Sequence, residues 1–221
     1  MLIVGLRYTT QVIVLSETGD TMKNTNKLKL QSNTTKVDVW DILVRIFHWS
    51  LVLFFTIAYL TEDDWLDIHT IAGYTVFLLL IFRLVWGVIG TKYAKFRNFL
   101  PQPKRAIQYL KDEISGDAKQ YLGHNPAGAI MVYLLIIVLF LTTLSGMAII
   151  STEGFGPLAG TFVSQWSGKT LEDIHELLTS LILFLVFLHI AGVVFSSFMQ
   201  EENLVKAMIT GKKQTENKGE K

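Results

Sequence analysis

The chain has 221 residues, half of them apolar and only 18% charged, and its mean hydropathy is +0.38. This balance is unusual for a water-soluble fold and is typical of a small bundle of membrane-spanning helices. The chain has no cysteine, which excludes disulfides, thiolate-held iron–sulfur clusters, cysteine-containing zinc sites and covalently attached c-type haem. Metal chemistry would therefore depend on the five histidines. The net charge of +1 indicates no partner, and we expect none among nucleic acids.

We expect residues 1–38 to be an N-terminal cytoplasmic arm. Its first stretch, LIVGLRYTTQVIVLS, is too short to span a membrane, is interrupted by Arg7 and lacks a clear cleavage site, so we do not interpret it as a signal peptide. Met22 opens a polar, basic leader. We favour Met22 as the start of translation, with residues 1–21 a mis-annotated extension.

Four apolar segments have the length that a bilayer-spanning helix requires, about 20 residues. None of them contains a proline that would interrupt a continuous helix. They predict an all-α membrane protein, a four-helix up-down bundle over residues 39–200. The expected spans are Ile42–Leu60, Ile68–Ile89, Ala127–Ile150 and His175–Met199.

The distribution of lysine and arginine predicts the orientation of the bundle, because short cytoplasmic loops collect these residues. Of the 20 basic residues, 18 lie before or at Arg45, between the second and third spans, or after Gln200. The connection TEDDWLD between the first two spans has four carboxylates and no basic residue. Both termini are therefore expected in the cytoplasm, with residues 201–221 a cytoplasmic tail and the protein in the bacterial inner membrane.

The long cytoplasmic connection contains a segment with apolar residues near helical spacing, at Ile107, Leu110 and Ile114. It predicts a short amphipathic helix that lies on the membrane surface or against a partner. An ordinary solvated linker helix is the alternative. His124, in the sequence GHNPAG before the third span, is expected to belong to the turn that starts that helix.

Four histidines lie in or at the ends of the spans, where ionisable side chains are costly and often mark a function. In an up-down bundle, His48 and His189 fall in the cytoplasmic half, and His69 and His175 in the outer half. His175 and His189 are 14 residues apart, about 21 Å along the helix axis and within about 40° of the same face. Two stacked histidine pairs, His48 with His189 and His69 with His175, are the arrangement that two b-type haems require.

Small and cationic residues accompany these histidines. Gly73 and Gly192 follow His69 and His189 by about one turn, where helix backbones would have to approach a flat macrocycle closely. Ser145 and Gly146 add a small pair on the third span. Two arginines, Arg83 within the second span and Arg45 one turn before His48, could neutralise haem propionates.

Each of these residues also has a simpler interpretation. An intramembrane histidine can be a hydrogen-bonded packing residue, and His69 and His175 at the interface need no special explanation. Arg83 could extend its guanidinium towards the cytoplasmic surface. The haem hypothesis depends on the joint pattern of two depths, two pairs and one shared face.

The motifs RIFHW, IHTIAGY, GHNPAGA, DIHE and FLHIAG resemble the prokaryotic cytochrome b561 family, which includes the b-type cytochrome subunit of membrane-bound nickel–iron hydrogenases. The resemblance covers residues 39–213 and implies a four-helix cytochrome with two haem b groups that exchanges electrons with the quinone pool. It implies haem ligands at His48, His69, His175 and His189. A very short first external loop and the absence of a second histidine soon after DIH depart from hydrogenase-type subunits and favour a general b561-type cytochrome.

These observations lead to one main hypothesis and two alternatives. The main hypothesis is an electron-transfer protein that links a basic periplasmic partner, such as a small cytochrome c, to quinone across the membrane. The first alternative is a membrane anchor and electron-accepting subunit of a hydrogenase or a similar periplasmic dehydrogenase. The second is a transporter that uses the histidines to carry a metal ion or protons. Whether the protein is an enzyme subunit, and whether it forms a homodimer, stay open.

Overall fold

The computed structural model describes residues 34–62 and 64–216, and the expected arm and its start site at residues 1–33 lie outside them. Four helices are long and apolar enough to cross a membrane, as the sequence predicts. The two 3-10 turns η1 (Phe96–Asn98) and η2 (Phe162–Gln165) lie in connections. The remaining elements in chain order are β1 (Thr34–Asp38), α2 (Ile42–Leu60), α3 (Leu66–Ile89), α4 (Pro103–Ile114), α5 (Pro126–Thr152), α6 (Gly168–Met199), α7 (Leu204–Thr210) and β2 (Lys212–Glu216).

Local capping explains where the long helices begin. The side chain of Asn125 accepts a hydrogen bond from Gly128 N, and Pro126 occupies the first turn of α5, where its missing N–H costs nothing. The expected helix-start turn at GHNPAG is therefore present. Ser167 caps α6 in the same way, so α6 begins seven residues before the expected start at His175. The extra turns are polar and carry Glu172 and Asp173.

Asp41 joins the start of α2 to the end of α3. Its carboxylate accepts hydrogen bonds from Val44 N at 2.9 Å, Trp86 Nε1 at 3.2 Å and Thr91 Oγ1 at 2.6 Å. Burial alone would raise the pKa of Asp41, but these hydrogen bonds outweigh it and hold the pKa below its ordinary value. The two helices are thereby fixed to each other at the end where the first histidine lies.

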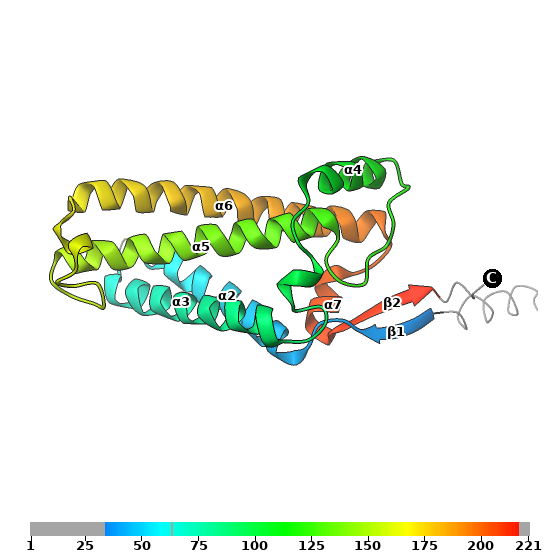
Figure 1. The fold of residues 1–221 in the computed structure, drawn as a ribbon, viewed down its shortest axis with the longest axis horizontal. Coiled ribbons are helices and arrows are strands. Elements are labelled where there is room, and N and C mark those ends of the chain that lie inside the picture. Colours follow the sequence, from blue (N-terminus) through cyan, green and yellow to red (C-terminus); the bar gives the residue numbers. More distant parts are fainter. Residues whose placement is uncertain (1–33, 63, 217–221) are drawn as a thin grey trace, which may run out of the picture. The chain divides into compact units, whose positions relative to one another are not determined.

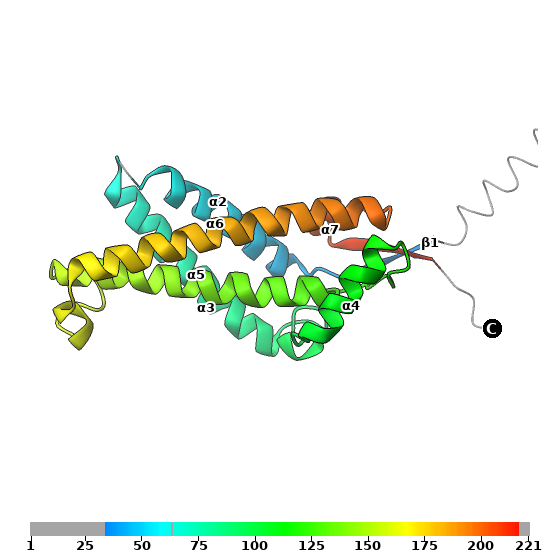
Figure 2. The ribbon, with the colours of Figure 1, turned by 90° about the horizontal axis from the view of Figure 1, so that it is seen from above.

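The four long helices pack in a chain of neighbours: α2 on α3, α3 on α5, and α5 on α6 (Figures 1 and 2). The buried core is small and aliphatic and comes from α3, α5 and α6, and α2 packs against it with the partly buried Leu51, Phe54 and Phe55. Most of the apolar surface of the spans faces outward, as lipid contact requires. The core residues are Val76, Leu80, Val138, Leu139, Ile182 and Leu185.

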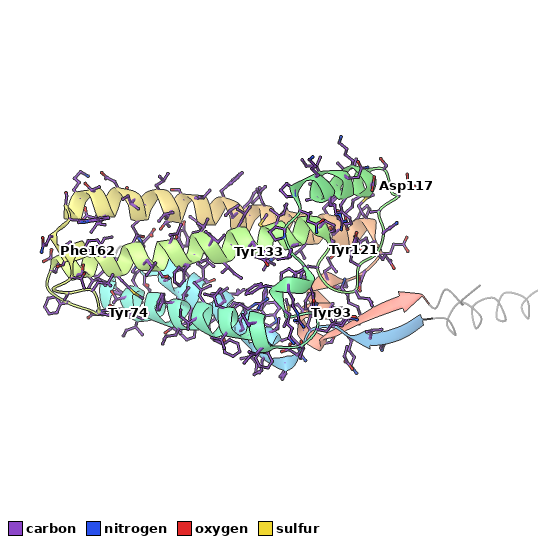
Figure 3. All side chains as sticks on the ribbon, viewed as in Figure 1. Tyr74, Tyr93, Asp117, Tyr121, Tyr133 and Phe162 are labelled. Carbon is purple, nitrogen blue, oxygen red and sulfur yellow. The ribbon has the colours of Figure 1, made fainter. Side chains whose placement is uncertain are left out.

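α4 lies beside one end of α5 and α6 (Figure 1). Figure 3 places Asp117 and Tyr121 of the following loop at this end and Phe162 of the α5–α6 connection at the opposite end. The buried side of α4 consists of Ala106, Tyr109 and Glu113. The helix that the sequence predicts is therefore present, and its apolar face is exposed about a quarter turn from the docked side.

The chain after α6 continues into α7 and β2, and β2 pairs with β1 in a two-stranded sheet. Residues 36–214 form one compact unit. Within this unit Lys213 is buried, and its Nζ lies 3.0 Å from Glu202 Oε2 and donates to the Tyr121 carbonyl at 3.1 Å. The residues expected as a tail thus include a helix and a strand. An ion pair joins two of these residues, and the hydrogen bond from Lys213 to Tyr121 holds them against the loop before α5.

Candidate functional site

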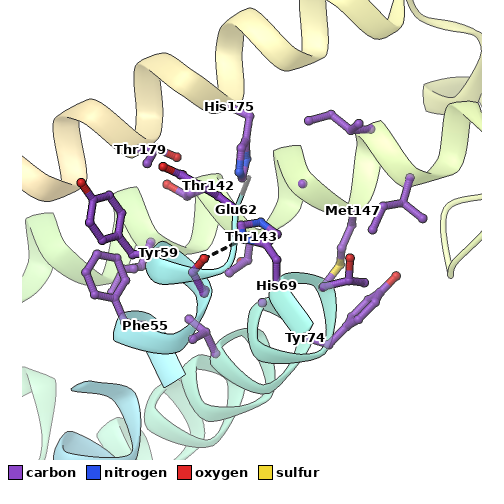
Figure 4. A pocket seen from close by; sticks show the side chains of 18 of the residues that line it. Phe55, Tyr59, Glu62, His69, Tyr74, Thr142, Thr143, Met147, His175 and Thr179 are labelled. Atoms are coloured by element: carbon purple, nitrogen blue, oxygen red, sulfur yellow. Dashed lines mark hydrogen bonds between the residues drawn. The ribbon is translucent and has the colours of Figure 1, made fainter. Parts of the chain in front are cut away.

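His69 and His175, the pair that the sequence predicts for the outer half of the bundle, face each other. His69 lies in the first turn of α3 and His175 two turns into α6, and their ring centroids are 6.2 Å apart at an interplanar angle of 79°. Figure 4 shows the two rings directed toward each other, with Thr142 and Thr143 of α5 beside them. The structure therefore brings together the two histidines that the sequence pairs at this level.

The hydrogen bonds of both rings fix their tautomers. His69 Nδ1 lies 2.8 Å from the Ala58 carbonyl oxygen, so this nitrogen must carry the proton and donate it. Ser145 Oγ donates its one proton to the Thr142 carbonyl at 2.8 Å and lies 2.9 Å from His175 Nδ1, so it must accept a hydrogen bond from that ring. In both histidines Nε2 is left with a free lone pair, which is the form that ligates a metal.

The separation of the rings fits one metal ion between them. Two metal–imidazole bonds of about 2 Å and two ring radii of about 1.1 Å add to about 6 Å between centroids. The observed 6.2 Å agrees with this sum.

All four long helices line a pocket of about 270 Å³ around these rings. Its walls are largely apolar, and the described residues that line it include no lysine or arginine. Gly73 lines this pocket, and a Cβ atom added to it would meet no atom within 4 Å, so open space lies beside His69. A Cβ at Gly146 would come 3.3 Å from His175 Cε1, so this glycine makes room for the ring.

The predicted inner histidines are arranged differently. His48 and His189 are both half-buried, and no ring contact between them occurs in the described part of the chain. The helices that carry them, α2 and α6, have at most marginal backbone contact. Gly192 is exposed and has open space where a Cβ would lie. The structure thus does not bring this pair together as closely as it brings the outer pair.

Buried polar atoms without a partner gather around the inner level. They include His48 Nδ1, Arg45 Nε, Arg83 Nη1 and His124 Nδ1. A buried polar group left without a hydrogen bond costs about 1–3 kcal/mol, so such atoms indicate a group that would bind them. Arg45 and Arg83 are the two that we expect near an inner haem and that could donate to carboxylates, whereas Glu202 Oε1, which is also unpartnered, is an acceptor and does not fit such a group.

Arg83 is held in place without being neutralised. It is 3% exposed, its Nη2 donates to the Ala94 carbonyl at 3.1 Å, and its guanidinium carbon lies 4.4 Å from the centre of the Phe96 ring. Its side chain is therefore packed under the α3–α4 connection. The guanidinium thus extends towards the end of the bundle that the sequence predicts to be cytoplasmic, and it is buried there.

His124 extends this cluster. Its ring packs against Trp40 and Phe99, with centroids 4.8 and 4.2 Å away. Burial, followed by the positive charges of Arg83 and Lys213, lowers the pKa of His124 to about 3. The histidine is therefore neutral at physiological pH. It lies where positive charge already gathers.

Sequence reasoning missed the groups that orient the outer histidines. The Ala58 carbonyl is a backbone atom, which no side-chain motif could reveal. Ser145 stands out in the sequence only as a small residue beside Gly146. Its position at the level of His175, on the neighbouring helix, is the one signal that could have identified it as a hydrogen-bond acceptor.

Four candidate membrane-spanning helices with an internal pair of histidines are the arrangement found in membrane cytochromes with axial histidine ligands. The family model for prokaryotic cytochrome b561 matches residues 39–211. The chain belongs to this family. It is a b-type cytochrome of electron transport, a multi-pass protein of the bacterial inner membrane, and haem b is the cofactor that its family implies.

The curated relatives share only a low sequence identity with the chain. The chain is 26% identical to a probable Ni/Fe-hydrogenase B-type cytochrome subunit of Rhizobium leguminosarum bv. viciae, over 66% of this chain and 67% of the relative. Proteins of the same description from Bradyrhizobium diazoefficiens and Azotobacter vinelandii are 23% and 22% identical, over 80% and 88% of this chain and 86% and 93% of their own lengths. No solved structure matches the chain significantly.

Proposed function

We propose that this protein is a di-haem cytochrome that carries electrons across the membrane between a periplasmic redox partner and the quinone pool. The outer haem would be held by His69 and His175, and the inner haem by His48 and His189. The single observation that carries the proposal is the outer ring pair, 6.2 Å apart, with both Nδ1 atoms engaged and both Nε2 atoms free.

Each protein group would have a defined task at these sites. The imidazole Nε2 atoms would bind iron, and the Ala58 carbonyl and Ser145 hydroxyl would keep the outer rings in the ligating tautomer. Haem supplies reversible one-electron redox chemistry when bound. Arg45 and Arg83, with their unpartnered nitrogens, would bind the carboxylates of the inner group, and Gly73 and Gly192 leave space beside the ligands.

The charge distribution supports an orientation with both termini in the cytoplasm. The end of the bundle that carries α4 has most of the basic residues, and the opposite end exposes Glu62, Asp64 and Asp67. This acidic end would attract a basic periplasmic donor, an encounter that salt would weaken. A reporter fused to the C-terminus, active only in the cytoplasm, should be active in cells.

Haem quantitation combined with a reduced-minus-oxidised spectrum tests the proposal. We expect purified protein to give a b-type spectrum and two haems per chain. One haem per chain would remove the inner site from the proposal. A colourless protein that binds zinc would support a metal transporter instead.

The relatives' descriptions favour a second candidate, in which the protein is the membrane anchor and electron acceptor of a periplasmic hydrogenase. The two candidates share the haem sites and differ in the donor. Purification of the tagged chain from its native membrane tests the difference. A stoichiometric nickel–iron partner would support the anchor, and reduction of the isolated chain by a basic cytochrome c would support the general carrier.

A further inference from the structure

We propose that α4 is an interfacial helix, which inserts the ridge formed by Ile107, Leu110 and Ile114 into the membrane leaflet at its end of the bundle and places lysines against anionic lipid headgroups. This ridge is 58%, 45% and 71% exposed at its three residues. The proposed partner is a lipid surface, namely the leaflet that surrounds this end of the bundle.

The ridge is distinct from the face that docks α4 on the bundle. Ala106, Tyr109 and Glu113 form the docked face and are 4%, 4% and 2% exposed. At about 100° per residue the ridge is centred roughly a quarter turn away from this face. The apolar ridge thus needs another explanation than packing against α5 and α6.

Buried hydrogen bonds fix the orientation of α4. Tyr109 Oη donates to Glu113 Oε1 at 2.9 Å, and the same carboxylate accepts from Gln200 Nε2 at 2.8 Å. Asn125 Nδ2 donates to Tyr109 Oη at 3.1 Å. Because these side chains are held together, α4 cannot roll to hide its ridge without breaking several buried hydrogen bonds.

The two anchoring residues also set the depth of α4. Asn125 directly precedes α5 and Gln200 directly follows α6. The 23 residues of Leu177–Met199 contain no aspartate, glutamate, lysine or arginine, and they span about 34 Å, close to the hydrocarbon thickness of a bilayer. Gln200 therefore lies at the membrane–water boundary, and α4, bonded to it, lies at the same level.

Charges beside the ridge complement anionic lipid. Lys104 and Lys111 are both exposed and lie seven residues apart, on one flank of the ridge. The adjoining face carries the polar residues Arg105, Gln108 and Asp112. An apolar ridge with lysines along its edge is the pattern of helices that lie in the headgroup region of anionic membranes.

The absence of natural cysteine makes a site-specific test direct. Single-cysteine variants Ile114→Cys and Leu110→Cys report on the ridge, and Gln108→Cys is the matched control on the polar side of the same helix. Each full-length variant is spin-labelled and reconstituted in vesicles of phosphatidylethanolamine and phosphatidylglycerol. Collisions with oxygen, which concentrates in lipid, are compared with collisions with a water-soluble nickel complex.

We expect labels at positions 110 and 114 to collide several-fold more with oxygen than with nickel, and the label at 108 to show the reverse. Lys104→Gln combined with Lys111→Gln should make the ridge labels shallower in anionic vesicles and leave them unchanged in phosphatidylcholine. Ridge labels that meet the nickel complex freely would overturn the proposal. Labels shielded from both reagents, more so at high protein density, would also overturn it, in favour of a second copy of the chain.

Discussion

The outer and inner histidine levels differ in how completely the protein prepares them. At the outer level each Nδ1 has a partner, Ala58 for His69 and Ser145 for His175, and the rings stand 6.2 Å apart. At the inner level His48 Nδ1 has no partner, and neighbouring arginine nitrogens are also unsatisfied. The difference indicates that the protein alone sets the geometry of the outer pair, whereas at the inner level it leaves buried nitrogens without partners.

Removing one ligand from each level should have the largest effect. His175→Ala should abolish outer haem binding, and His189→Ala inner haem binding, each leaving about one haem per chain by pyridine haemochrome assay. Because the outer pocket is preformed, the outer haem should survive the inner mutation in full. The reverse loss, of both haems from His189→Ala alone, would contradict the independence of the two levels.

Ser145→Ala should weaken haem binding at the outer site without removing a ligand. The change leaves His175 Nδ1–H without its acceptor, and loss of such an orienting partner costs about 10–100-fold in metal affinity. Haem titration of the reconstituted apoprotein would measure this for the outer site alone. Ser151→Ala is the matched control, because Ser151 is a buried serine of α5 that donates only to the Ala148 carbonyl. Equal effects of the two changes would indicate a general packing defect.

The four spans and the outer histidine pair could be predicted from the sequence, but the groups that orient these histidines could not. The four spans follow from hydropathy alone, and α2 begins and ends at the predicted Ile42 and Leu60. The pairing of His69 with His175 follows from up-down topology, because both lie at the outer end. Sequence could not reveal the Ala58 carbonyl, since a backbone acceptor depends on how α2 and α3 cross.

Two other features show where helical periodicity is insufficient. Ile107, Leu110 and Ile114 predict an amphipathic helix correctly, but the face buried on the bundle is the neighbouring one, formed by Tyr109 and Glu113. A glutamate at 2% exposure contradicts a hydropathy-based assignment of faces. Its burial is compensated by hydrogen bonds from Tyr109 and Gln200, and Gln200 is distant in sequence.

Arg83→Gln should change the midpoint potential of the inner haem more than that of the outer haem. Removing a buried positive charge disfavours the electron-rich ferrous state of the nearer haem, so the inner midpoint potential should fall on the order of 50 to 100 mV, while the outer potential stays nearly constant. Redox titration followed by optical spectroscopy would resolve the two. Arg97→Gln, on the exposed η1 turn, serves as the control. A larger shift in the midpoint potential of the outer haem would contradict the assignment of Arg83 to the inner level.

The smallest effect should appear in the pH dependence of stability, and it concerns His124 of the inner cluster. Burial lowers its folded pKa to about 3, from the ordinary 6.5, so the folded protein keeps this ring neutral while the unfolded chain takes up a proton. Protonation of His124 in the unfolded chain therefore costs little stability above pH 6.5, and the free energy of unfolding falls as the pH drops toward 3, by about 1.4 kcal/mol at pH 5.5.

His124→Phe keeps an aromatic ring between Trp40 and Phe99 but cannot bind a proton. The variant should therefore lose less thermal stability than the wild type between pH 7.5 and pH 5.5, as measured by the unfolding midpoint in detergent. Equal losses in both proteins would mean that His124 is protonated in the folded state. Since Glu202 already pairs with Lys213, the positive charge of Arg83 would then have to be neutralised, and the haem carboxylates would be the first candidates.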